Sequence, residues 1–259
     1  MVGGPAASDA VVRARRLPNL AVGLHLDLVD GFPVLPRAEV SGLIREDGRF
    51  ERNMARAGIR FFFLPRVRRQ LSMEIRAQFE AFRATGLRLD HVNAHKHMHV
   101  HPTVARMIVE IGRDYGMRAV RVPMEPIELL RAAFPGERHS APLYRPWIKR
   151  LQRRLRAAGM LVNDQVFGLA WSGDFDEGRL LGLIPHLPDG ISEIYLHPAT
   201  EDTHVLDAAM PGFRRTGELG ALLSPFVQTR VAEFGITLAT YSGLLMTRRN
   251  EAWEPLTPY

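Results

Sequence analysis

Short apolar runs alternate along the chain with longer stretches in which apolar residues recur every three or four positions. The short runs predict β-strands at residues 21–26, 87–93, 119–122, 192–196 and 236–240. The longer stretches predict α-helices at residues 8–16, 70–84, 102–115, 146–159, 177–184 and 217–234. Strands that alternate with helices are typical of a parallel sheet, which is either open or closed into a barrel.

One strand–helix unit is clearly bracketed by the residues that begin and end its helix. Pro102 suits a first helical position, and Gly116 follows the last apolar turn, where a glycine commonly ends a helix. In parallel α/β folds the functional groups gather where strands end and loops begin. Candidate chemistry is therefore sought at the ends of the predicted strands.

Composition favours one globular domain over residues 1–259. The chain is 46% hydrophobic and 24% charged, and it has no internal repeat or linker that would divide it. No apolar run is long enough to cross a membrane, and the first residues do not have the pattern of a signal peptide, so we expect a cytoplasmic protein. The absence of cysteine excludes thiolate ligands, which leaves nitrogen and oxygen donors for any metal.

The net charge of +6 is concentrated in local basic runs near residues 13–16, 66–69 and 145–156. A basic surface favours anionic partners such as phospholipid or nucleic acid. No recognisable nucleic-acid-binding module appears, so we expect no nucleic-acid partner. The sequence leaves the oligomeric state open, with a homodimer among the states that it allows.

The densest chemical signal is a group of five histidines within residues 91–101, directly after a predicted strand. We expect the chain to turn there into a loop that carries His95 and His97 before the next helix opens. Imidazoles at a strand end suit zinc, manganese or similar divalent ions. The competing interpretation is a histidine-rich turn with one or two hydrogen-bonded core histidines and the rest solvated.

Two further histidines occupy the same kind of position in other predicted strands. His25 lies in the run 21–28, and His197 ends the run 191–197 and is followed by proline. Taken alone, each would more often be a core histidine that bonds a backbone carbonyl. Because three strands end in the same way, we expect His25, His95 and His197 to share one site at the mouth of a barrel.

These three motifs, Gly23-Leu-His25-Leu, His91-Val-Asn-Ala-His95-Lys-His97 and Tyr195-Leu-His197-Pro, resemble the YdjC-like carbohydrate deacetylases. The resemblance implies a distorted β/α barrel that holds one divalent ion. It favours Mg²⁺ as this ion, with Zn²⁺ or Mn²⁺ as alternatives. It implies that His25 and His95 ligate the ion and that His197 is catalytic.

More narrowly, the sequence is similar to the hopanoid-biosynthesis-associated branch of this family, which removes an acetyl group from an N-acetylglucosaminyl hopanoid. That similarity rests on the sequence of residues 93–98 and on Arg118-Ala-Val-Arg121-Val-Pro-Met-Glu125. His97, Arg121 and Glu125 are then the expected substrate-binding residues. For Arg121 and Glu125, the alternative is a surface ion pair of little energetic value.

The family pattern differs from this sequence in two places. Family members carry an N-terminal strand that ends in paired aspartates, one a metal ligand and the other a base, and this sequence shows no such pair. We interpret this as a start codon assigned at an internal methionine, or as a shortened chain. The nearby carboxylates Asp27, Asp30 and Asp90 are not expected to replace the pair. The second departure is Asn93, where chitooligosaccharide deacetylases carry aspartate.

Two segments raise the possibility of peripheral membrane contact. The predicted helix 146–159 places Trp147, Ile148, Leu151 and Leu155 on one face and most of its cations on the other, although an ordinary surface helix is the more common explanation. Residues 61–64, Phe-Phe-Phe-Leu, are followed by three arginines and form a second apolar and cationic segment.

Two functions other than a deacetylase remain open at this stage. A non-catalytic carrier of sugar or lipid predicts binding without release of acetate. A metal-dependent phosphoesterase could use the same histidines and would release phosphate instead.

Overall fold

The computed structural model describes residues 1–139, 143–202 and 210–251. Its residues cluster into two compact units, one formed by 1–121, 150–162 and 239–259 and the other by 122–149 and 163–238. The prediction of one domain over residues 1–259 remains a prediction.

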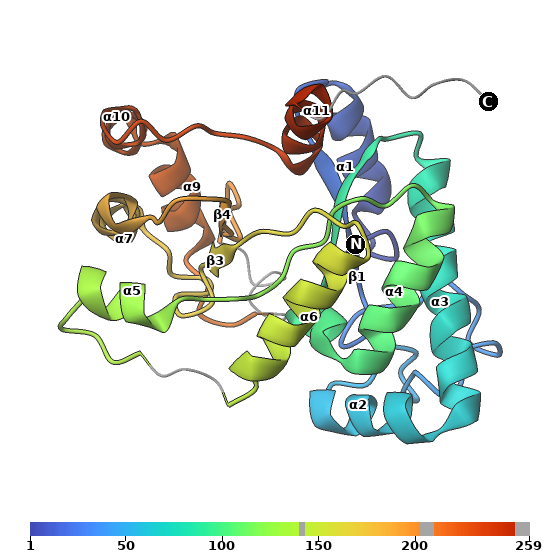
Figure 1. Ribbon diagram of the computed structural model, residues 1–259. Coiled ribbons are helices and arrows are strands. Elements are labelled where there is room, and N and C mark those ends of the chain that lie inside the picture. The colour runs from blue at the N-terminus through green and yellow to red at the C-terminus, as the bar shows by residue number, and fades with distance from the viewer. Residues whose placement is uncertain (140–142, 203–209, 252–259) are drawn as a thin grey trace. The chain divides into compact units, whose positions relative to one another are not determined.

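The first unit is built on a parallel pair of strands, β1 (Val22–Leu26) and β2 (Leu89–Ala94). Between them in the sequence lie α2 (Met54–Phe63) and α3 (Pro65–Ala84). β2 continues into the short 3-10 helix η1 (His95–Val100) and α4 (Pro102–Asp114), and α3 and α4 run beside each other (Figure 1). The helices α1 (Ala7–Arg15) and α11 (Tyr241–Glu251) complete the unit.

The second unit contains the other parallel pair, β3 (Gln165–Phe167) and β4 (Ser192–Ile194). Its helical elements are α5 (Ile127–Ala133), α7 (Glu177–Leu183), η2 (Ile184–His186), α9 (Arg215–Leu223) and α10 (Pro225–Glu233). Phe167, Phe175 and Leu183 are fully buried in its core. The helix α6 (Arg145–Ala157) is divided between the two units in sequence.

The α/β class and the parallel pairing that the sequence predicts are both confirmed. The strand predicted at residues 119–122 is reduced to two isolated parallel bridges. Ala119 pairs with Leu161, and Val120 pairs with Val92. Closure of the strands into a barrel stays a prediction. No helix in the described parts of the chain combines the length and the apolar character that crossing a membrane requires.

Two predicted elements are wrong. Residues 236–240 form no strand, and they lead instead from α10 to α11. The single helix predicted at 217–234 is two helices, because Pro225 has no N–H to continue the ladder of α9. Ser224 accepts the first free N–H groups of α10 through its side chain and so caps the second helix.

A stripe of polar side chains on the buried face of α3 holds the long loop that follows β1. Gln70, Glu74 and Gln78 are spaced four residues apart and therefore share one face. Gln70 accepts the backbone N–H of Gly42, and Glu74 accepts those of residues 34 and 35.

Gln78 completes the stripe at the end of β1. Its side-chain oxygen accepts the N–H of Asp27 (2.9 Å), and its side-chain nitrogen donates to the carbonyl of Asp27 (2.7 Å) and to Glu74 (2.8 Å). Burial raises the pKa of Glu74, although these hydrogen bonds oppose the change. The side chains of α3 thus satisfy backbone groups of the loop that its own backbone hydrogen bonds, such as that from Phe50 to Gly31, leave over.

We predict that Gln78→Ala lowers the free energy of unfolding by about 3 kcal/mol, because it leaves the buried N–H and C=O of Asp27 without partners. Urea denaturation followed by circular dichroism measures the change. Gln228→Ala on α10 is the matched control, since Gln228 is exposed and its loss should change stability by no more than about 0.5 kcal/mol. Equal midpoints for Gln78→Ala and the unmodified protein would show that the stripe does not hold the loop.

Candidate functional site

His25 and His95 lie next to each other at the carboxyl ends of β1 and β2. The two strands run in parallel with His25 opposite Asn93, so that His95 is the first residue after β2. The imidazole centroids are 5.8 Å apart, and the ring planes are inclined by 69°. The structure therefore brings these two predicted ligands together, while their role as ligands stays a prediction.

Asn93 fixes the orientation of the His25 ring. The Nδ1–H of His25 donates to Oδ1 of Asn93 across 2.6 Å, and this assigns the proton to Nδ1 and leaves a lone pair on Nε2. Metal-binding histidines are commonly held in this way through their other nitrogen. Burial lowers the pKa of His25 to about 3, although the hydrogen bond to Asn93 opposes it. The ring is therefore neutral near pH 7.

Backbone strain is concentrated at this site. Asp30, Lys96 and His97 are the non-glycine residues with left-handed backbone conformations in the described parts of the chain, with φ of 68°, 49° and 55°. Lys96 and His97 directly follow His95, Asp30 comes five residues after His25, and Lys96 and Asp30 form an ion pair of 2.5 Å. The Asp30 carboxylate also lies 3.8 Å from Nε2 of His95. Strained residues of this kind tend to cluster where function requires a fixed geometry.

Asp27 provides a buried carboxyl group directly after β1. Burial raises its pKa to about 7, although hydrogen bonds from the backbone of Val29 and Gly31 oppose the shift. Gly31 is required here, because a Cβ at that position would overlap the carboxylate of Asp27. Oδ1 of Asp27 has no hydrogen-bond partner among the described residues. An acid that titrates near neutral pH is suited to proton transfer.

His95 is buried, like Asp27. Burial lowers the pKa of His95, and Asp30 acts in the opposite direction. The site thus combines two imidazoles whose pKa values are lowered by burial with a carboxyl group whose pKa is raised.

The other histidines of the group 91–101 point to different places. His91 donates to Asp90 (2.9 Å) and stacks near Tyr241, and His101 packs against Phe61 and Phe62. His99 is buried, which holds its pKa well below its usual value, and its ring centroid is 5.9 Å from that of His97. The group therefore does not form one metal centre, and only His95 faces His25.

His197 belongs to the second unit, where it follows β4. Its backbone N–H donates to the buried carboxylate of Glu218, which also accepts the N–H of Phe175. Its ring lies between Tyr195 and Phe213, with centroid distances of 5.5 and 5.0 Å. Convergence of His197 with the histidine pair, which belongs to the first unit, stays a prediction.

Glu125 holds a turn of the second unit. It is buried, and its carboxylate accepts the backbone N–H groups of Gly168, Leu169 and Ala170 at 2.9–3.0 Å. Burial raises its pKa, although these three hydrogen bonds oppose the shift. The alternative of a surface ion pair is wrong for Glu125. The predicted contact of Arg121, Glu125 and His97 with substrate is not tested by these observations.

The residues present fit a divalent ion only in part. His25 and His95 offer two neutral nitrogen donors on facing rings. Across the described residues, however, no group of three or more His, Asp or Glu side chains stands at metal-binding distances. A metal held by this pair would therefore need a further ligand from outside this set or a shift of a nearby carboxylate.

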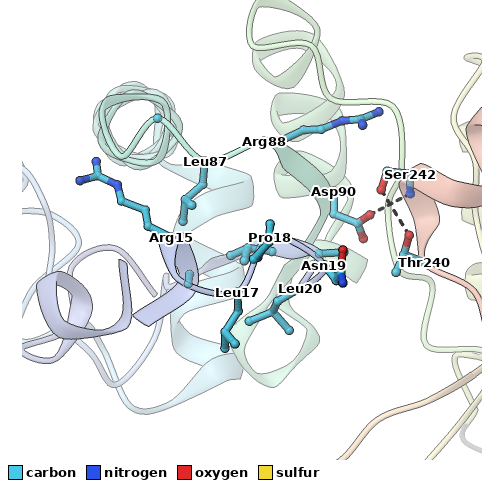
Figure 2. Close-up of a pocket in the computed structure, with 14 residues that line it drawn as sticks. Arg15, Leu17, Pro18, Asn19, Leu20, Leu87, Arg88, Asp90, Thr240 and Ser242 are labelled. Atoms are coloured by element: carbon cyan, nitrogen blue, oxygen red, sulfur yellow. Dashed lines mark hydrogen bonds between the residues drawn. The ribbon is translucent and has the colours of Figure 1, made fainter. Parts of the chain in front are cut away.

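A cavity of about 380 Å³ lies elsewhere, at the amino ends of β1 and β2 (Figure 2). Asp90 faces it, accepting the N–H of Ser242 (2.8 Å) and the ring N–H of His91. Burial alone would raise the pKa of Asp90, but these hydrogen bonds lower it to about 2. None of the predicted site residues lines this cavity. The carboxylate of Asp90, which faces it, caps the first turn of α11. We therefore place the candidate centre at the histidine pair.

The fold and the site define an α/β protein with paired histidines at the ends of adjacent parallel strands. The sequence matches the YdjC-like protein family over residues 1–233. The chain belongs to that family.

Relatives named carbohydrate deacetylase align with nearly the whole chain. The protein of Geobacillus stearothermophilus is 29% identical over 93% of this chain and 83% of its own length. The protein of Brevibacillus brevis is 26% identical over 94% of this chain and 86% of its own length. A crystal structure from Enterococcus faecalis, assigned only provisionally to cellobiose-phosphate cleavage, has a TM-score of 0.71 at 23% identity, and it covers 94% of this chain and 85% of its own. That likeness shows the fold alone.

We predict a pH dependence of stability that is specific to His25. Its folded pKa lies below that of the unfolded chain, so protonation favours unfolding: the contribution is present above about pH 6.5 and is lost as the pH falls. In metal-free protein, His25→Gln should reduce the slope of unfolding free energy between pH 6.5 and 5 by up to about 1.4 kcal/mol per pH unit. His186→Gln, at an exposed histidine, is the control. An unchanged slope in His25→Gln would contradict the buried neutral ring.

Proposed function

We propose that this protein is a metal-dependent carbohydrate N-deacetylase whose chemistry takes place at the carboxyl ends of β1 and β2. The observation that carries the proposal is the facing pair His25 and His95, surrounded by the strained residues of the first unit. Membership of the YdjC-like family supports it, as do relatives that are named carbohydrate deacetylases.

In this proposal, Nε2 of His25 and the ring of His95 hold one divalent ion. Asn93 keeps the proton on Nδ1 of His25, so that the ring presents a lone pair without rotation. Such an ion would act as a Lewis acid and polarise an amide carbonyl. We favour Mg²⁺ from the family resemblance, with Zn²⁺ or Mn²⁺ as alternatives.

Asp27 is the residue that we propose as proton acceptor. Its carboxyl group is buried and titrates near neutral pH, and one oxygen is uncommitted among the described residues. The ionised form can take a proton from an attacking water, and the acid form can return it to the leaving amine. This assignment revises the expectation from sequence, which gave Asp27 no such role.

His197 is proposed as the second catalytic group, which protonates the leaving amine or stabilises the developing oxyanion. Its main chain is anchored by Glu218 and its ring by two aromatic neighbours, and this limits the orientations that it samples. His97 and Arg121 are proposed to contact the sugar. Glu125 would contribute by fixing the turn 168–170 rather than through free oxygens.

The proposed substrate is an N-acetylglucosamine-type sugar, specifically the head group of a hopanoid glycolipid. This finer assignment rests on the resemblance of residues 93–98 and 118–125 to the hopanoid-associated branch. Soluble chitooligosaccharides are the alternative within the same chemistry, and the two are separated by comparing kcat/KM.

Release of acetate is the direct test of the proposed reaction. The metal-supplemented protein should release acetate from N-acetylglucosaminyl substrates, and a chelator should abolish the release. His25→Ala, His95→Ala and His197→Ala should each lower kcat/KM by at least about 100-fold. His186→Ala, at an exposed histidine, should retain activity. Release of phosphate from matched phosphosugars, with no release of acetate, would instead identify a phosphoesterase.

Asp27→Asn tests the proton acceptor separately. We expect kcat to fall by about 100- to 10,000-fold. The activity of the unmodified protein should rise as Asp27 ionises near pH 7, and this rise should be absent in the variant. Because the folded pKa of Asp27 is raised, the unmodified protein loses stability as the pH rises from about 4 to 7. Asp27→Asn should therefore be at least as stable at pH 8. An inactive variant that is also unfolded at pH 8 would point to a structural role.

A sugar- or lipid-binding protein without catalysis is the second candidate. It is favoured by the lack, among the described residues, of a complete group of metal ligands. This candidate predicts saturable binding of the acetylated ligand, measured by calorimetry, with no release of acetate at any metal concentration.

A further inference from the structure

The helix α2 exposes an apolar face to solvent in addition to the face that it buries. Ala57 and Phe61 point into the protein. Ile59, Phe62 and Phe63 are spaced by three and four residues and so share the other face, with exposed fractions of 61%, 48% and 68%. Leu64, the next residue, is 45% exposed. We call these four residues the α2 patch.

Local structure fixes the α2 patch at a corner between two helices. Asn53 caps α2 by accepting the N–H of Arg56. Leu64 is extended before Pro65, which is the first residue of α3 and which disfavours helical geometry in the residue that precedes it. The helices α2 and α3 meet at this corner (Figure 1), and Phe62 and Phe63 lie in the last turn of α2 before it. His101 packs beside Phe61 and Phe62 from the inner side.

The sequence segment that carries the patch is rich in arginine, and one of these arginines, Arg56, pairs with Glu51. Residues 52–73 contain six arginines and no acidic residue, and the rest of the chain carries 28 basic and 28 acidic side chains. This segment therefore carries a net charge of +6, as does the basic run at residues 145–156. Arg66 and Arg69 are exposed, and the described parts of the chain place no ion pair on either.

We propose that the α2 patch and its arginines form a surface that docks on an anionic lipid bilayer. Exposed aromatic and aliphatic side chains can enter the boundary between headgroups and acyl chains, while the arginines remain among the phosphates. Each basic residue near such a surface strengthens binding by about 5-fold. The inference goes beyond the proposed deacetylase activity and does not depend on it.

Two other occupants fit these observations less well. A second copy of the chain, joined through the same patch by a two-fold axis, would bring six arginines against six arginines. A nucleic acid would satisfy the arginines but would leave Ile59 and Leu64 in water or against phosphates. Only a bilayer supplies an apolar layer behind a negative one.

The helix α6 does not provide the alternative membrane surface that its sequence suggested. Ile148, Leu151 and Leu155, three of the four residues on its apolar face, are buried in the protein. The interpretation of α6 as an ordinary surface helix is therefore the correct one, and the α2 patch is the apolar and cationic surface that stays exposed.

Sedimentation with vesicles tests the proposal on the full chain. We expect binding to vesicles of phosphatidylcholine with phosphatidylglycerol, weakening with salt, and little binding to phosphatidylcholine alone. Phe62→Ser with Phe63→Ser should abolish binding, and Arg66→Gln with Arg69→Gln should weaken it about 25-fold. The matched controls are Phe226→Ser, at a 69% exposed phenylalanine of α10, and Arg150→Gln with Arg153→Gln on α6. Both controls should bind normally.

Insertion of the α2 patch into the bilayer can be measured with a fluorophore on one introduced cysteine, because the chain has no cysteine of its own. A Phe63→Cys variant labelled with an environment-sensitive fluorophore should show a blue shift on anionic vesicles, and labelled Phe226→Cys should not. Failure to bind anionic vesicles at low salt would overturn the proposal, and so would equal loss of binding in the control variants. A dimer that dissociates in Phe62→Ser with Phe63→Ser, or binding that nuclease removes, would assign the patch to another partner.

Discussion

The hydrogen bonds from the buried face of α3 to the loop after β1 are the constraint on which the candidate site depends. Gln78 holds both backbone groups of Asp27, and Glu74 and Gln70 hold the loop further along. Without them, the amides that these three side chains accept would have no partner in the described structure. Asp30 then reaches from this loop to Lys96 and so links it to the loop after β2. The geometry around His25 and His95 is in this sense set by a helix that contributes no residue to the chemistry.

This arrangement explains how much of the site could be found from sequence. His25 and His95 were recognisable because each follows an apolar strand, and parallel strands place such ends side by side. The roles of Asn93, Asp27 and the ion pair of Asp30 with Lys96 were not recognisable, since they depend on which buried groups lack other partners. The spacing of Gln70, Glu74 and Gln78 on an otherwise apolar helix face was the available signal for the loop, because buried polar residues need partners.

The fold shows a similar division. The long amphipathic helix α4 was predicted close to its observed bounds, because its apolar spacing repeats over several turns, whereas α3 begins at Pro65, five residues before the predicted start. The short elements β3 and α5 carry too few residues for a period to be visible. Residues 236–240 resemble a strand in composition, but β-propensity only reflects fit to a half-buried sheet, and there is no sheet at that place.

The left-handed conformations of Lys96 and His97 have a consequence for engineering. Each costs about 1–2 kcal/mol relative to an ordinary conformation, a cost that glycine would avoid. Because glycine at Lys96 would also remove the ion pair with Asp30, a screen for heat-resistant variants would favour glycine at His97. Such variants would survive higher temperatures but would lose the loop rigidity that aims His95, so thermal tolerance and catalytic competence would be selected in opposite directions.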